Sequence, residues 1–313
     1  GAMSMNRLLS SARTLVPLGA LFLLAGCDDY ALLFPKGDIG LQERSLILIA
    51  LGIMLAVVIP VIILTLVFAW RYRASNTNAT YAPKWAHSNG IEFVIWTIPC
   101  LIVLFLAVMI WQTTHKLDPY QPLESKVPPV RVEVVALNWK WLFIYPDYGI
   151  ATVNELPIPA GTPINFKLTA DSIMNSFFIP HLGSQVYAMG GMQTQLHLIA
   201  DQPGIYPGRS SAYSGSGFSD MHFKAVATDR ATFDAWVRKV QHSQLVLDKA
   251  SYTELAKPSI KNASTTYARV DPKLFDDIVN QYMPAMTHPT HDMAKMAMVE
   301  GPMCGPQRAK SAE

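Results

Sequence analysis

The sequence has few cysteines and few charged residues, and each shortage excludes a class of protein. Its 313 residues include only 3 cysteines, at positions 27, 100 and 304, so a disulfide framework is excluded. Charged residues make up 15% of the chain and hydrophobic residues 50%, as in a membrane protein with a sizeable soluble part. The net charge is only +2 and the sequence has no basic cluster, which argues against nucleic acid as a partner.

The N-terminal segment predicts an exported, lipid-anchored protein. Basic residues precede an apolar stretch, as in a secretory signal. The Leu-Ala-Gly-Cys sequence at 24–27 resembles the lipobox of bacterial lipoproteins, whose cysteine becomes the lipid-modified first residue. We therefore predict a lipoprotein signal peptide over 1–26, lipidation of Cys27, for example by palmitate, and a periplasmic segment over 27–45. The alternative is an ordinary signal peptide with an incidental cysteine.

Two apolar runs, 46–70 and 91–112, are each long enough to span a bilayer as a helix. The connector at 71–90 contains Arg71, Arg73 and Lys84 and no acidic residue, so it is expected on the cytoplasmic side. The two transmembrane helices should therefore form a hairpin with both ends in the periplasm.

Beyond the second run the sequence is typical of a β-rich domain, predicted over 113–229. Short segments rich in β-branched and aromatic residues recur between turn signals, which favours an all-β sandwich. The expected strands lie at 130–134, 138–145, 164–168, 193–198 and 223–227, with a proline-rich turn at 157–163. Apolar residues then recur at helical spacing, so 230–284 is expected to be a helical extension. The segment 285–313 lacks periodicity and is expected to be a disordered tail.

This arrangement resembles subunit II of the haem–copper respiratory oxidases, and specifically the ubiquinol-oxidising, bo-type branch. The segments that carry the resemblance are 136–146, 149–155, 175–180, 182–189 and 191–194. The resemblance extends from the lipobox to about Met283. It implies a membrane α + β protein, with a two-helix transmembrane hairpin, a periplasmic cupredoxin-like β-sandwich and a short helical C-terminal extension.

In the cytochrome c-oxidising branch of this family, the domain holds a dinuclear copper centre. The copper-ligand positions correspond here to Asn175, Tyr213, Gly215, Gly217, Met221 and Lys224. None of them retains its ligand type. Both thiolates are lost, and the predicted domain contains no other cysteine that could replace them. The resemblance therefore predicts a cupredoxin-like domain without copper.

Two other groups of residues raise the question of a different metal site. The β-rich domain contains the histidines and methionines His181, His197, His222, Met174, Met189, Met192 and Met221. Their spacing matches no metal-binding motif, so we predict no metal there. The tail contains His288, His291, Met293, Met296 and Met298. These residues suggest a role in copper delivery, although their composition favours a disordered terminus.

Glu92 is the one residue of this chain for which the resemblance implies a part in the chemistry. It stands at the cytoplasmic edge of the second apolar run, where the family has a glutamate at the start of a proton-uptake path. Ionisable residues at membrane depth are costly and tend to be functional. The alternative is a glutamate that complements the helix dipole and extends towards water.

The resemblance implies a non-redox subunit II of a proton-pumping ubiquinol oxidase in the inner membrane. Two haems and one copper are expected in subunit I, which ubiquinol would reach through the membrane; subunits III and IV are further expected partners. No soluble cytochrome c is expected to bind. Trp139 and Trp141 are expected to pack against subunit I. The alternatives are a copper-carrying subunit II of a cytochrome c oxidase and a free-standing envelope lipoprotein for copper handling.

Overall fold

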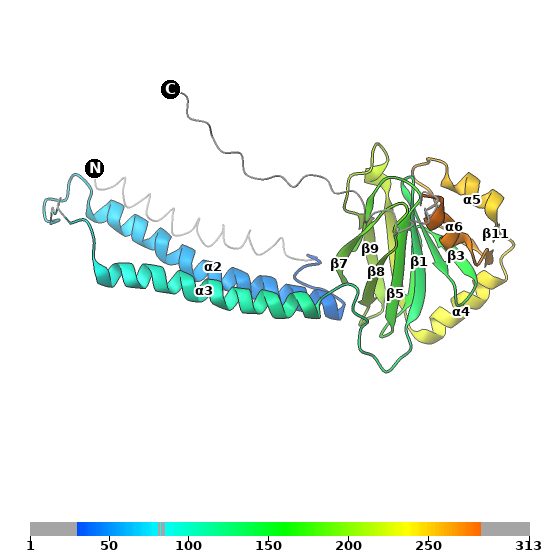
Figure 1. Cartoon of the computed structure of the whole chain (residues 1–313), viewed down its shortest axis with the longest axis horizontal. Helices are drawn as coiled ribbons and strands as arrows, with labels where there is room; N and C mark the ends of the chain where they lie inside the picture. The colour runs from blue at the N-terminus through cyan, green and yellow to red at the C-terminus, as the bar shows by residue number, and fades with distance from the viewer. Residues whose placement is uncertain (1–29, 81, 83–84, 283–313) are drawn as a thin grey trace, which may run out of the picture.

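The protein consists of a long helical hairpin attached to a β-rich domain (Figure 1). The computed structural model describes residues 30–80, 82 and 85–282. The predicted signal peptide, the lipid site Cys27 and the tail at 285–313 lie outside the described residues.

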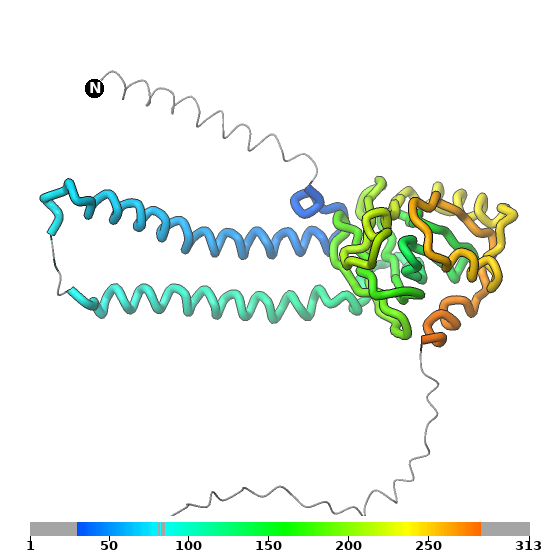
Figure 2. The backbone as a smooth tube through the Cα atoms, turned by 90° about the horizontal axis from the view of Figure 1, so that it is seen from above, coloured from blue at the N-terminus to red at the C-terminus, as the bar shows by residue number. Residues whose placement is uncertain are grey.

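The hairpin is formed by α2 (Asp38–Arg71) and α3 (Asn89–Lys116), which run antiparallel in Figures 1 and 2. Both helices are long and apolar enough to cross a membrane. Each extends beyond the predicted apolar run, because polar residues at both ends continue the helix. Pro60 and Pro99 lie inside the helices, where each proline removes one backbone hydrogen bond.

Two packed sheets confirm the predicted sandwich. The first sheet has the strand order β12-β3-β2-β1-β5-β8 and the second has the order β4-β10-β9-β6-β7. Their strands are β1 (Val130–Leu137), β2 (Lys140–Tyr145), β3 (Ile150–Val153), β4 (Glu155–Pro159), β5 (Pro163–Ala170), β6 (Asn175–Ile179), β7 (Gly183–Ala188), β8 (Thr194–Ile199), β9 (Gly204–Ser210), β10 (His222–Thr228) and β12 (Thr265–Tyr267).

Aromatic side chains fill the space between the sheets. Trp141 and Phe143 from the first sheet face Phe177 and Phe223 from the second, and all four are buried. The rings of Phe177 and Phe223 stack with centroids 5.0 Å apart, and Trp141 meets Phe177 edge-on at 5.4 Å. Aromatic pairs at such distances stabilise the fold by roughly 0.5–1.5 kcal/mol each beyond their burial. Strand β6 therefore contributes to this core directly, because Phe177 lies two residues after Asn175, the first residue of the strand.

Two details of the predicted strands are wrong. The strand predicted over 138–145 begins only at Lys140, because Asn138 and Trp139 form the turn between β1 and β2. The predicted turn at 157–163 begins too early, since Pro157 and Pro159 belong to β4. Strand β4 is an edge strand, and prolines are tolerated there because their nitrogens face away from the paired strand.

The C-terminal extension contains short strands as well as the predicted helices. Its helices are α4 (Arg230–Gln241), α5 (Lys249–Ala256) and α6 (Leu274–Gln281). A two-stranded ribbon forms from β11 (Val246–Leu247) and β13 (Arg269–Val270), and a short helix, η1 (Phe218–Asp220), precedes β10. Strand β12 of the extension pairs with β3 and completes the edge of the first sheet.

The start of α2 is joined to the β-domain through backbone contacts, which we call the joint (residues 36–43 against 181–184). The Gly40 amide donates to the Leu182 carbonyl at 3.1 Å, and the Lys36 amide donates to the His181 carbonyl at 2.6 Å. Gly183 has φ +99°, and a Cβ there would lie 2.7 Å from the Gly40 nitrogen. Only glycine permits this approach, so α2 is fixed directly to the domain.

Candidate functional site

The predicted copper-ligand positions lie mainly at the start of β6 and in the loop between β9 and β10, residues 211–221, called the 211–221 loop below. Asn175 is the first residue of β6 and is buried. Its Nδ2 donates to the Ile173 carbonyl at 2.9 Å, and its Oδ1 accepts from Ser210 Oγ at 3.1 Å. The side chain of Asn175 is therefore committed to bonds within the protein.

Trp139 holds the 211–221 loop in place. Its indole N–H donates to the Ser214 carbonyl at 2.8 Å. A Cβ on Gly217 would lie 2.3 Å from Trp139 Cδ2, and one on Gly215 would lie 3.4 Å from Trp139 Cζ2. The indole therefore lies against Gly215 and Gly217, the predicted positions of a carbonyl ligand and a copper-binding cysteine.

The backbone of this region is unusual at two positions. Trp139 has φ +61°, which is uncommon for a residue with a large side chain. Gly215 has φ +100°, which glycine adopts without a steric penalty. A left-handed conformation at a non-glycine residue costs on the order of 1–3 kcal/mol and persists only where surrounding contacts enforce it. The indole hydrogen bond to the loop is one such contact.

The remaining three positions have different surroundings. Met221 is buried, with its Sδ 4.0 Å from Ser214 Oγ. Tyr213 is 77% exposed and contacts Phe218, with ring centroids 5.6 Å apart. Lys224 is exposed on β10, in register with Glu155 of β4. The structure thus brings Asn175 and the loop close together through Ser210 but leaves Lys224 on the outer face of the sheet.

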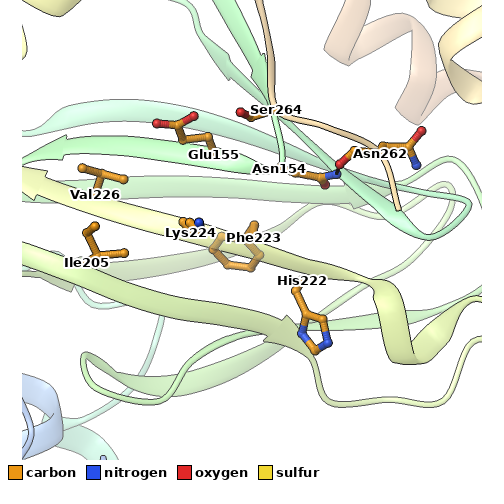
Figure 3. Close-up of a pocket in the computed structure, with 9 residues that line it drawn as sticks. All are labelled: Asn154, Glu155, Ile205, His222, Phe223, Lys224, Val226, Asn262 and Ser264. Atoms are coloured by element: carbon orange, nitrogen blue, oxygen red, sulfur yellow. Dashed lines mark hydrogen bonds between the residues drawn. The ribbon is translucent and has the colours of Figure 1, made fainter. Parts of the chain in front are cut away.

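A pocket of about 510 Å³ lies on that outer face (Figure 3). It is lined by Asn154, Glu155, Ile205, His222, Phe223, Lys224, Val226, Asn262 and Ser264. Asn154 is already engaged, since its Oδ1 accepts from the Trp141 amide at 2.9 Å and its Nδ2 donates to the Asn262 carbonyl at 3.0 Å. The pocket offers one lysine, one glutamate and one imidazole, which is no set of soft ligands for copper.

The donor atoms at the predicted positions do not fit a copper centre of the electron-transfer type. Such a centre needs thiolate and imidazole ligands in a fixed cage. The two positions predicted for cysteines hold a glycine and an exposed tyrosine, and the two predicted for imidazoles hold an amide and a thioether. The Trp139 indole also lies against Gly217, where a cysteine side chain would have to project.

The histidines considered as an alternative metal site lie on separate elements. His197 is on β8 of the first sheet, and its Nδ1 is 2.8 Å from the Pro119 carbonyl. His222 is on β10 of the second sheet, and His181 is in the turn before β7, where its ring lies 5.9 Å from that of Tyr206. Within the described part of the chain, no group of three or more His, Cys, Asp or Glu residues could hold a metal ion.

Trp141 cannot pack against another subunit, which corrects the prediction for this residue. Its side chain is fully buried between the sheets, in contact with Phe177 and Phe223. Side chains alternate along a strand, and Trp141 is on the face of β2 that points into the core. Trp139 is only partly buried, but its indole is committed to the 211–221 loop.

A cluster around Asp171, just after β5, was not predicted from the sequence. The Asp171 carboxylate accepts hydrogen bonds from Tyr252, Gln281 and Tyr282, the Tyr282 bond being 2.7 Å long. Burial, reinforced by Asp171, raises the pKa of Tyr282 to about 12 and that of Tyr252 further. The Asp171 cluster therefore ties the C-terminal extension to the same end of the sandwich as Asn175.

A second polar contact joins the extension to β2. Lys140 is buried, and its Nζ donates to the Lys257 carbonyl at 2.8 Å and to Ser259. Burial lowers the pKa of Lys140, because it disfavours the charged form of the amine. No carboxylate is among the described contacts of Nζ to offset this effect. No short sequence motif marks either contact, because the partners are far apart in the chain.

Glu92 lies in the first turn of α3 and is exposed. Its backbone amide donates to the Ser88 carbonyl at 2.9 Å, which begins the helix. The first turn of α3 lies at the end of the hairpin farthest from the β-domain (Figure 1).

Comparison with known proteins gives matches along nearly the whole chain. The family model for the periplasmic domain of cytochrome c oxidase subunit II matches residues 149–227, and that for the COX aromatic-rich motif matches residues 241–286. The chain is 52% identical over 303 residues to cytochrome bo(3) ubiquinol oxidase subunit 2 of Pseudomonas putida, covering 96% of both proteins. It is 55% identical over 279 residues to ubiquinol oxidase subunit 2 of Acetobacter aceti, covering 88% of this chain and 90% of that protein.

Solved structures give a weaker likeness. The periplasmic domain of cytochrome oxidase subunit II from Bradyrhizobium japonicum is 18% identical, with a TM-score of 0.36. The match covers 38% of this chain and 96% of that domain. The family models and the close relatives, rather than this structure, identify the domain.

Proposed function

The chain belongs to the ubiquinol oxidase subunit 2 family, and we propose that within that respiratory complex it is a scaffold without a redox centre of its own. Its relatives are subunits of an oxidoreductase, and membership of this family places the chain beside subunit I in the inner membrane, with the β-domain in the periplasm. The observation that carries the proposal is the donor set at Asn175, Tyr213, Gly215, Gly217, Met221 and Lys224.

Electrons then bypass the periplasmic domain. Ubiquinol is soluble in the membrane and can reach subunit I directly, whereas a soluble cytochrome needs a copper relay at the periplasmic surface. The haems and the oxygen-binding copper would belong to subunit I. The contribution of this chain is positional: the joint fixes α2 to the domain, so membrane and periplasmic parts dock on subunit I as one body.

The test is to purify the complex and compare electron donors. We expect turnover with ubiquinol and none with reduced cytochrome c. Metal analysis of the separated subunit should find no copper bound to the β-domain. Stoichiometric copper in that domain, with strong visible absorption, would show that the second candidate, a copper-carrying subunit, is correct.

Glu92 is proposed to take up protons at the cytoplasmic side. Its exposure in the first turn of α3, at the connector end of the hairpin, supports this role. Glu92→Gln keeps the shape of the side chain and removes its charge. We expect slower proton uptake in an assembled complex with unchanged haem content. Unchanged turnover would leave only the helix-dipole role.

The lipid anchor and the additional subunits complete the proposal. We propose that Cys27 is the lipidated first residue of the mature chain and that subunits III and IV join the complex. Intact mass spectrometry of the purified subunit tests the first point, since an unmodified residue 27 or an uncleaved N-terminus contradicts it. The same preparation, separated by gel electrophoresis, shows which other subunits are present.

A further inference from the structure

A second pocket, of about 360 Å³, lies beside the 211–221 loop. It shares His222 with the larger pocket drawn in Figure 3. Its lining combines two basic side chains with three hydroxyls and one aromatic ring: Arg209, Ser210, Ser211, Phe218, Ser219 and His222. None of these lining residues is acidic, so the pocket offers hydrogen-bond donors and no carboxylate. A lining of this kind suits an anion.

The register of the sheet places the two basic side chains side by side. Arg209 of β9 is paired directly with His222 of β10. The next pair, Gly208 and Phe223, faces the core, since Phe223 is buried and a Cβ on Gly208 would lie 2.1 Å from its ring. Side chains alternate along a strand, so Arg209 and His222 both project from the outer face of the second sheet. The Cβ atoms of such directly paired residues lie about 5 Å apart.

The described part of the chain does not neutralise these basic groups. The side chains of Arg209 and His222 make no hydrogen bond or ion pair to a described residue, whereas Arg131 and Arg230 each pair with an aspartate. Lys224 projects from the same face two residues after His222, about 7 Å along the strand, and it too lacks an ion pair within the described residues. Like charges close together on a sheet destabilise it. A bound anion would remove this repulsion.

Two hydroxyls of the pocket are also available to a ligand. The Ser210 hydroxyl donates to Asn175 Oδ1 at 3.1 Å and is therefore committed to the protein. The hydroxyls of Ser211 and Ser219 have no hydrogen-bond partner among the described residues, and both residues are exposed. The guanidinium fork of an arginine matches pairs of phosphate oxygens. A phosphoryl group has three strong acceptor oxygens and can accept from several donors at once, whereas a carboxylate has only two oxygens.

We propose that this pocket binds a phosphate-bearing anion, with the Arg209 guanidinium and the His222 imidazole as its main donors. The hydroxyls of Ser211 and Ser219 complete the site, and Lys224 adds electrostatic attraction from the adjacent outward position of β10. None of the four donors is one of the predicted copper-ligand positions, so the site is separate from the vacant copper frame. The phosphoryl group is common to free phosphate and to a phospholipid headgroup, and the test below distinguishes these two sources.

The test is arginine footprinting of the purified complex in detergent with phenylglyoxal, which modifies free guanidinium groups. Mass spectrometry reports the rate of modification at each arginine. Inorganic phosphate should slow the modification of Arg209 about fivefold relative to chloride, the factor expected at about four times the dissociation constant. The two salts are compared at equal ionic strength, so that screening is the same. Arg269 is exposed and outside both pockets, and its rate should not change.

A pair of double variants tests the assignment of the donors. Replacing His222 and Lys224 together by alanine should raise the phosphate concentration that half-protects Arg209 on the order of tenfold, because a donor and a nearby charge are removed. The matched control replaces Lys239 and His242, which are exposed at the end of α4, and removes the same two types of side chain. It should leave the half-protecting concentration within about twofold.

Three results would overturn the proposal. The first is equal modification of Arg209 in phosphate and in chloride. The second is an equal shift in the two double variants, which would reflect the overall charge of the domain. The third is an Arg209 that reacts in the isolated full-length chain but not in the complex in chloride, since another subunit then covers the pocket. The source of the phosphoryl group follows from the same complex in phosphatidylglycerol nanodiscs without free phosphate. Protection of Arg209 there supports a lipid headgroup, and protection only after phosphate is added supports the free anion.

Discussion

The turn that follows β6 is held to α2 by backbone atoms, whereas the Asn175 end of β6 is held to the 211–221 loop mainly by side chains. At the joint, backbone amides donate to carbonyls and two glycines touch. At the other end, Trp139 and Asn175 bridge to the loop through their side chains. The backbone contacts of the joint depend on the sequence mainly through its glycines, whereas the side-chain contacts at the other end depend on the identity of Trp139 and Asn175. Substitutions at the Asn175 end should therefore leave the attachment of α2 to the domain at the other end undisturbed.

Gly183→Ala should have the largest effect, because it breaks the backbone end of this comparison. Alanine at φ +99° is strained, and its Cβ would lie 2.7 Å from a backbone nitrogen that cannot move aside. Strain and overpacking together should cost roughly 3 kcal/mol in the free energy of unfolding. Urea unfolding followed by β-sheet circular dichroism measures this. Gly149→Ala is the matched control, since Gly149 has φ +67° with no atom within 4 Å of a new Cβ. A loss in the control as large as that at Gly183 would show that strain alone matters.

Gly217→Ala should be less damaging, because the atoms it meets belong to side chains. Its Cβ would lie 2.3 Å from Trp139 Cδ2 and 2.7 Å from Ile260 Cγ2. Moving these side chains should cost about 2 kcal/mol. In a Trp139→Gly background the same substitution should cost much less, and this double-mutant cycle isolates the contact. Equal costs in both backgrounds would mean that Trp139 does not restrain the loop.

Tyr252→Phe sharpens the comparison at the Asp171 cluster. Loss of a hydrogen bond to a carboxylate should lower the free energy of unfolding by about 1.5 kcal/mol.

The cluster also predicts a pH dependence. The pKa of Tyr282 is raised from its usual value near 10 to about 12. Its contribution is therefore complete below about pH 10 and is lost as the pH rises towards about 12. Tyr282→Phe should remove this part of the alkaline transition, and an identical alkaline profile in the variant would contradict the assignment.

Ser184→Ala should have the smallest effect, because it leaves the backbone of the joint intact. The hydroxyl donates to Glu43 Oε1 at 3.0 Å, but the Ser184 amide donates to the same oxygen at 3.1 Å. The loss should be about 1 kcal/mol or less. Ser45→Ala, in the exposed part of α2, is the reference and should change the urea midpoint least. A loss near that of Gly183→Ala would mean that side chains, not backbone contacts, carry the joint.

The sequence predicted the hairpin and the sandwich because both depend on local patterns. Apolar runs of sufficient length identify α2 and α3, and β-branched alternation identifies strands such as β1. The turn at Trp139 was missed because a bulky aromatic residue at positive φ is rare. The segment with Pro157 and Pro159 was predicted to be a turn because proline is disfavoured inside a sheet. Their position on an edge strand depends on the tertiary fold and has no local signal.

The candidate site was predicted only as a set of positions. The resemblance identified Asn175 and Gly217 but not what surrounds them, because the contact of Trp139 with Gly217 joins distant segments. The burial of Trp141 likewise follows from which face of β2 meets the second sheet. The Asp171 cluster joins β5 to the C-terminal helices and has no local signal.

The pairing of β12 with β3 has a consequence for the order of folding. Thr265–Tyr267 lie more than a hundred residues after Ile150–Val153, yet they form the last strand of the first sheet. Contacts so distant in sequence form late, because the closure of a long loop must precede them. As the chain emerges on the far side of the membrane, the free edge of β3 stays open until residue 267 has been translocated. An interruption of export before that point should leave an aggregation-prone strand edge, and the aromatic-rich extension is what closes it.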